Sequence, residues 1–130
     1  GATATTVRLV SFGPISVTNT VHSEVTNAIT DPGNAGAIPV TDSGHCAIVT
    51  AGNETRTLAI PTFKGQELLL YIKTDGGTCV ITVASAINQT GNNTITMADV
   101  RDSIRLQAIE SGSNLVWDVV ANNGAALSTV

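Results

Sequence analysis

Asp42, Ser43 and His45 stand within four positions of one another and carry the three side-chain types of a hydrolytic triad. A triad works only when the base is hydrogen-bonded to both the nucleophile and the orienting acid. Neighbouring residues on a strand point alternately to opposite faces, so this spacing suits that geometry poorly. The sequence also lacks a Gly-x-Ser-x-Gly nucleophile elbow. We therefore expect a polar turn ahead of a strand, and no enzymatic activity.

The candidate metal ligands are few and lack the spacing of known sites. They are His22, Asp42, His45, Cys46 and Cys79, with Glu24 two residues after His22. No CxxC, HxxxH or HExxH pair occurs, and two ligands on one strand face do not make a site. The glycine-rich stretch 33–36 lacks the lysine of a phosphate-binding loop. The sequence predicts neither a metal site nor a cofactor.

Cys46 and Cys79 are the only cysteines, and both lie inside apolar runs. Two cysteines in a chain of this length do not form a disulfide framework, so we expect two small buried side chains with free thiols. A bridge between them would require the two strands to lie close together. Trp117 alternates with Leu115 and Val119, which favours a place in the core over a sugar-binding platform.

The composition indicates an all-β protein. One residue in three is Thr, Val or Ile, types that fit pleated surfaces better than helices. The net charge is −4, and the six Lys and Arg residues form no basic stripe, so a nucleic-acid partner is not expected. No run of 18 apolar residues occurs, so a membrane partner is not expected either.

Alternating apolar residues and turn signals predict the strands. Residues 66–74 and 78–84 flank Asp75-Gly76-Gly77, which predicts an antiparallel hairpin. Further strands are predicted at 7–12, 15–21, 45–51, 56–60, 94–97, 102–109 and 115–120, and Asp31-Pro32-Gly33-Asn34 is predicted to be a turn. Alternation places Leu69 and Tyr71 on one face of their strand, and it points Ile104, Leu106 and Ala108 inward. The expected fold is a single-domain, all-β antiparallel sandwich or jelly-roll-like barrel. It comprises a flexible N-terminal arm (1–6), a β domain (7–120) and a C-terminal tail (121–130).

About half of the chain resembles a pattern common in small structural proteins of tailed bacteriophages. The pattern runs through an apolar-Pro step, a Gly-Gln strand, a Val-rich strand, Thr-Ile-Thr, an Asp-Ser strand and a Trp-x-Val-Val strand. The matching segments are 58–61, 64–70, 77–83, 94–96, 102–106 and 116–120. Such domains occur in capsid decoration (cement) proteins and in fibre or tail-spike modules. The match does not extend into residues 7–57.

The short chain without a coiled-coil or repeat stalk favours the decoration role. The resemblance then implies a homotrimer on the capsid exterior of a virion, assembled in the cytoplasm of a bacterial host. Its partner would be the major capsid protein, and it would stabilise the expanded shell by bridging capsid subunits. A fibre or tail-tip adhesin module is the alternative reading, and an extracellular carbohydrate-binding domain is a further one.

The N-terminal arm is the predicted capsid-binding segment. It comprises Ala2, Thr3, Ala4, Thr5 and Thr6, and the contact could continue to Val10. The arm is uncharged, is rich in threonine and leads into a β-prone run. A segment of this kind can add to an exposed sheet edge of a partner and exchange main-chain hydrogen bonds with it. The C-terminal tail, residues 121–130, is the rival anchor because its composition is similar.

Overall fold

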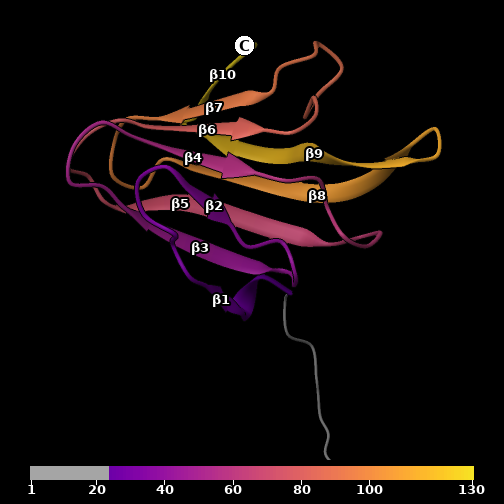
Figure 1. Ribbon diagram of the computed structural model, residues 1–130, viewed down its shortest axis with the longest axis horizontal. Coiled ribbons are helices and arrows are strands. Elements are labelled where there is room, and N and C mark those ends of the chain that lie inside the picture. Colours follow the sequence, from indigo (N-terminus) through magenta and orange to yellow (C-terminus); the bar gives the residue numbers. More distant parts are fainter. Residues whose placement is uncertain (1–23) are drawn as a thin grey trace, which may run out of the picture.

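The computed structural model describes residues 24–130, and within this range the chain forms two packed β-sheets (Figure 1). A 3₁₀ turn, η1, covers Glu24–Thr26. The strands are β1 (Ala28–Ile29), β2 (Gly36–Ile38), β3 (Gly44–Val49), β4 (Glu54–Leu58), β5 (Glu67–Thr74), β6 (Cys79–Val83), β7 (Thr94–Met97), β8 (Ser103–Ser111), β9 (Asn114–Asn123) and β10 (Ala126–Ser128). The expected all-β, single-domain sandwich is confirmed.

The strand order shows a chain that winds between the two sheets. The first sheet has the order β1-β3-β5-β8-β9, and the second has the order β10-β7-β6-β4-β2. From β1 to β6, each strand therefore lies in the opposite sheet from the one before it (Figure 1). This winding makes the pairs β1–β3, β3–β5, β2–β4 and β4–β6 parallel, whereas the later pairs are antiparallel. The pairing is thus mixed, and not antiparallel throughout.

The predicted hairpin between residues 66–74 and 78–84 is wrong. Strand β5 pairs with β3 and β8, whereas β6 pairs with β4 and β7. The Asp75-Gly76-Gly77 segment therefore carries the chain from one sheet to the other. Both strands contribute buried side chains to the same core, and their main-chain pairing is with other strands. Their sequences fit both arrangements, because each strand has an apolar face that must be covered.

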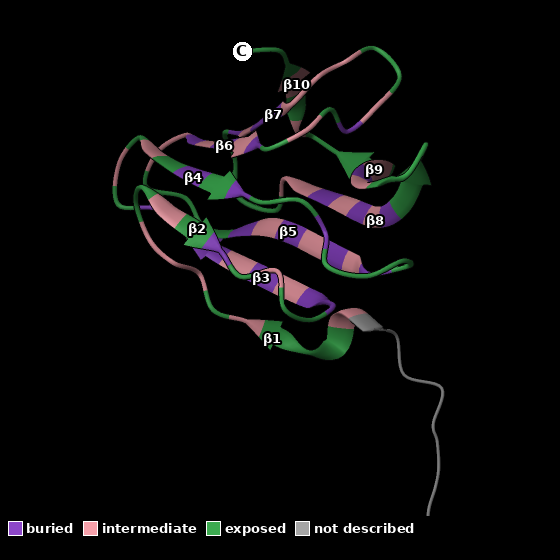
Figure 2. Ribbon diagram, turned by 45° about the vertical axis from the view of Figure 1, so that its right-hand side comes forward, coloured by how far each residue is buried: buried purple, intermediate pink, exposed green. Residues whose placement is uncertain are grey.

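Alternation along the strands builds the core between the sheets. On β5, Leu68, Leu70 and Ile72 are buried while the residues between them are half-buried, and β8 shows the same alternation (Figure 2). The inward positions predicted for β8 (Ile104, Leu106 and Ala108) are confirmed. Trp117 is 1% exposed and its indole N–H donates a hydrogen bond to the Ala59 carbonyl (2.9 Å), so its predicted place in the core is confirmed.

The C-terminal residues 121–130, predicted to be a flexible tail, belong to the sheets. Strand β9 extends to Asn123, and β10 pairs with β7 at the edge of the second sheet. Even the last residue is held, because the Val130 amide donates to the Asn93 side chain (3.0 Å). Small uncharged residues are typical of flexible tails, but strand pairing at a sheet edge uses main-chain groups and does not depend on side-chain size.

Two predictions for the N-terminal region lie outside the described residues. These are the strands at 7–12 and 15–21 and the capsid-binding arm, Ala2 to Thr6.

Candidate functional site

Asp42, Ser43 and His45, which carry the side-chain types of a triad, each make a separate contact in the structure. The Ser43 hydroxyl oxygen accepts a hydrogen bond from the Glu67 amide (3.0 Å), and Ser43 is buried. The Asp42 main-chain carbonyl accepts a bond from the Gln66 amide group (3.2 Å). His45 Nδ1 lies 2.6 Å from the Val25 carbonyl oxygen, which can only accept, so Nδ1 carries the proton. These contacts hold the start of β3 in place and assemble no nucleophile.

The candidate metal ligands are likewise dispersed. Among the residues that the structure describes, no three His, Cys, Asp or Glu side chains gather as a metal site would require. His22 lies outside the described residues. Within that same part of the chain, no helix has the length and apolar character needed to span a bilayer.

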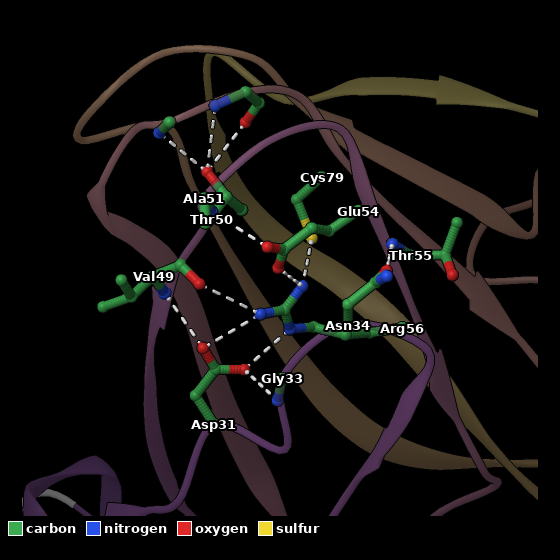
Figure 3. Close-up of polar contacts among 12 residues, drawn as sticks. Asp31, Gly33, Asn34, Val49, Thr50, Ala51, Glu54, Thr55, Arg56 and Cys79 are labelled. Atoms are coloured by element: carbon green, nitrogen blue, oxygen red, sulfur yellow. Dashed lines mark hydrogen bonds and ion pairs between the residues drawn. The ribbon is translucent and has the colours of Figure 1, made fainter.

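The most connected polar group in the described domain is the Arg56 guanidinium, which lies between the sheets (Figure 3). Its side chain has no solvent exposure. Nε and Nη2 donate to the two carboxylate oxygens of Asp31 (2.6 and 3.0 Å), and Nη1 donates to Glu54 Oε1 (3.0 Å). The remaining hydrogens face the Val49 carbonyl oxygen (3.2 Å) and Cys79 Sγ (3.6 Å). All five guanidinium N–H groups are thus engaged, and none is left for a ligand.

Asp31, in the loop between β1 and β2, accepts two of the hydrogen bonds from Arg56. Besides Arg56, its carboxylate accepts hydrogen bonds from the amides of Gly33 (3.1 Å) and Val49 (2.9 Å). Burial by itself would raise the pKa of Asp31, but the bonds from Arg56, Val49 and Gly33 outweigh it, and the pKa is lowered. The sequence pointed to Asp31 only as a turn residue. The sequence contained one indication of this network. Arg56 and Leu58 are two positions apart on β4, so both point to the same face of the strand, and an arginine on a buried face needs an acidic partner.

Both cysteines are free and fully buried, as expected. Burial raises the pKa of the Cys46 thiol to about 12. Burial also raises the pKa of Cys79, although the neighbouring Arg56 opposes this effect. A thiol is nucleophilic only as the thiolate, so neither side chain is prepared for chemistry.

We expect iodoacetamide to leave both thiols of the native protein unmodified at neutral pH. In denaturant without a reducing agent, the same reagent should modify Cys46 and Cys79 together. Intact-mass spectrometry reads both states directly. Rapid native labelling of either residue would contradict the buried, neutral thiols, and a 2 Da loss without labelling in denaturant would reveal a disulfide.

The outer face of the first sheet carries a hollow of about 540 Å³, which we call the sheet-face hollow. Its lining residues are Val25, His45, Leu69, Tyr71, Arg101, Ser103 and Asn123. They come from η1, strands β3, β5, β8 and β9, and the turn before β8. The rings of His45 and Tyr71 lie 6.4 Å apart between centroids. Sequence reasoning placed Leu69 and Tyr71 on one face of a strand, but could not bring β3, β8 and β9 beside them.

A second hollow of about 340 Å³ shares Leu69, Ser103 and Asn123 with the first, so the two are continuous across β5, β8 and β9. Arg105 lines this second part and lies 3.8 Å from Glu67 Oε1. A sheet face that combines rings, amides and guanidinium groups in one depression can bind a polar ligand but contains no assembled nucleophile.

No protein-family model matches this chain, and a search of curated proteins finds no match either. By its fold, the chain is an all-β sandwich domain. In the described part of the chain, the Arg56 network is buried between the sheets, and the sheet-face hollow is open to solvent.

Proposed function

We propose that this chain is a capsid decoration protein of a tailed bacteriophage, which binds the major capsid protein from outside as a homotrimer. The sequence resemblance carries the proposal. The segments that carry it run from the end of β4 into β9 and supply strands to both sheets, so they build one domain. A short sandwich of this kind can act by binding alone: a protein that binds only the expanded shell stabilises that shell by mass action.

Two further observations support this proposal. Both cysteines are free and buried, which suits assembly in a reducing bacterial cytoplasm. Charged residues make up only 12% of the chain, and Ile60, Phe63 and Ile109 are at least 41% exposed, so apolar surface is available for contacts with other copies. The guanidinium of Arg56 and the carboxylate of Asp31 are bonded to each other inside the described domain, so they serve the fold and are not part of the proposed binding surface.

The trimer is testable without a capsid. We expect sedimentation equilibrium at micromolar concentration to give about 40 kDa, three times the chain mass of 13.3 kDa. The same protein should bind expanded capsids to saturation at hundreds of copies per particle and raise their melting temperature. A 13 kDa monomer that does not cluster on capsids would contradict the proposal. A few to tens of copies per virion would instead favour the fibre or tail-tip alternative.

The N-terminal arm remains the proposed anchor, and the structure weakens its rival. Residues 121–130 are held by β10 pairing and by bonds from Thr129 and Val130 to the 91–93 turn, so they are not a free arm. We expect deletion of residues 1–6 to leave the trimer and its melting temperature unchanged. The affinity of the trimer for expanded capsids should fall by at least about tenfold. A truncated trimer that saturates capsids at unchanged affinity would remove the arm from the mechanism.

A further inference from the structure

We propose that the sheet-face hollow binds an acidic saccharide, with Arg101 receiving the carboxylate of the sugar. This proposal does not depend on the decoration role, because the hollow lies on the domain itself and needs no capsid partner. Its volume, about 540 Å³, falls within the range of small-molecule sites. The neighbouring hollow extends the same depression, so a ligand longer than one ring can follow it across β8 and β9.

Within residues 24–130, three polar side chains that line the hollow keep hydrogen-bonding groups open to a ligand. No bond within this range involves the hydroxyl groups of Tyr71 and Ser103 or the amide group of Asn123. A saccharide offers hydroxyl groups that donate and accept together, which matches these three groups.

The rings give the hollow a second property that sugars use. Tyr71 and His45 lie with an interplanar angle of 33°, and Leu69 and Val25 add apolar lining. The C–H face of a pyranose is apolar while its rim is polar, so it can pack on a ring while its hydroxyl groups bond to the side chains around it. His45 is oriented for this role because its Nδ1 is fixed on the Val25 carbonyl, which leaves Nε2 for a ligand.

Arg101 supplies the preference for an acid. Its backbone has a φ of +74°, a conformation rare for a side-chain-bearing residue. The turn around it is fixed, because its amide donates to the Ile72 carbonyl (2.9 Å) and the Asp102 carboxylate accepts from the amides of Ala98 and Asp99 (both 3.0 Å). Within the described range its guanidinium forms no ion pair, so its fork of donors is open to a bidentate carboxylate.

The position of the hollow favours a saccharide over a peptide. Peptides that add to a sheet do so at an edge, where main-chain donors and acceptors are free. Most of the hollow lies on the face of the first sheet, over strands β3, β5 and β8, which are paired on both sides, and it reaches the edge strand β9 at Asn123. Over the three paired strands only side chains are presented, so main-chain pairing contributes little to binding there.

The test uses the full chain and trigalacturonic acid as the probe, followed by amide chemical shifts in an NMR titration. We expect saturable shifts at millimolar concentration, centred on His45, Leu69, Tyr71 and Asn123. The fully methyl-esterified trisaccharide, which keeps the ring and loses the charge, should bind at least about tenfold more weakly. Arg101→Asn should weaken binding of the acid by a similar factor, and asparagine tolerates the left-handed backbone at this position.

Lys64→Gln is the matched control, because it also removes one positive charge but lies beside Glu110, outside the residues that line the hollow. It should bind the acid as the natural chain does, and both variants should melt at the natural temperature. Equal affinity for acid and ester, unchanged binding by Arg101→Asn, or no shifts at all would overturn the proposal. Tighter binding of a glutamate-rich peptide at the same residues would also overturn it, since the ligand would then be a protein carboxylate.

Discussion

Replacing Arg56 with methionine is expected to lower the free energy of unfolding by about 3–5 kcal/mol. Methionine keeps most of the buried length of the side chain, so the loss reports on charge and hydrogen bonding more than on a cavity. The substitution would leave Asp31 and Glu54, whose side chains are only 15% and 13% exposed, without their common partner. Thermal unfolding should show a melting temperature lower by more than about 10 °C.

Arg105→Met is the matched control for this prediction. Arg105 also pairs with a glutamate, but at 3.8 Å and with both side chains about a third exposed, so its loss should cost less than about 1 kcal/mol. Combining Arg56→Met with Asp31→Asn and Glu54→Gln should recover part of the lost stability, because no uncompensated charge then remains buried. An Arg56→Met protein as stable as the Arg105→Met protein would show that the buried network contributes little.

The pH dependence of the Arg56→Met effect follows from Asp31. Because the folded-state pKa of Asp31 is lowered, its contribution is complete above the unfolded value and is lost as the pH falls through the folded value. The natural chain should therefore lose stability below about pH 4. The Arg56→Met protein has no such contribution to lose, so the difference between the two proteins should narrow in the same range. A difference that stayed constant down to pH 2 would separate the effect from Asp31.

The sequence predicted local properties well, because these depend on near neighbours. Alternation places Ile104, Leu106, Ala108 and Trp117 in the core, and the structure buries all four. The apolar runs around Cys46 and Cys79 predict that both thiols are buried, which is also observed. The pairing of strands could not be obtained in this way. Parallel pairs such as β3 with β5 join residues 24 or 25 positions apart through segments in the other sheet, and no local pattern encodes that winding.

The polar sites could not be predicted from the sequence for the same reason, because their residues are distant from one another along the chain. Asp31 and Arg56 are 25 residues apart in the sequence and meet only because the loop before β2 passes over β3 and β4. The sheet-face hollow likewise depends on β3, β5, β8 and β9 lying side by side. Residue spacing can reveal a local motif such as a zinc-binding cysteine pair, but it cannot predict a site whose members come from distant parts of the sequence.

The crossing segment 75–77 provides the second large prediction, because Gly76 is required there for space. Neither Gly76 nor Gly77 has the positive φ that a tight hairpin turn would demand. A methyl group on Gly76 would instead overlap the Thr50 carbonyl oxygen and come within 2.9 Å of Ala51 Cα. The Thr50 hydroxyl already fixes this approach, since its oxygen accepts from the amides of Gly76 (2.9 Å) and Gly77 (3.1 Å). We expect Gly76→Ala to cost about 2–4 kcal/mol, measured by denaturant unfolding.

Gly52→Ala is the matched control, because it lies in the facing turn and a methyl group there meets nothing within 4 Å. It should change stability by less than about 1 kcal/mol. Thr50→Val should also destabilise the protein by about 1–2 kcal/mol, because it removes the acceptor of two part-buried amides of the crossing segment. In a hairpin, residues 75–77 would project away from Thr50, and neither Gly76→Ala nor Thr50→Val would be costly. Near-natural stability of both variants would therefore restore the hairpin and contradict the crossing between sheets.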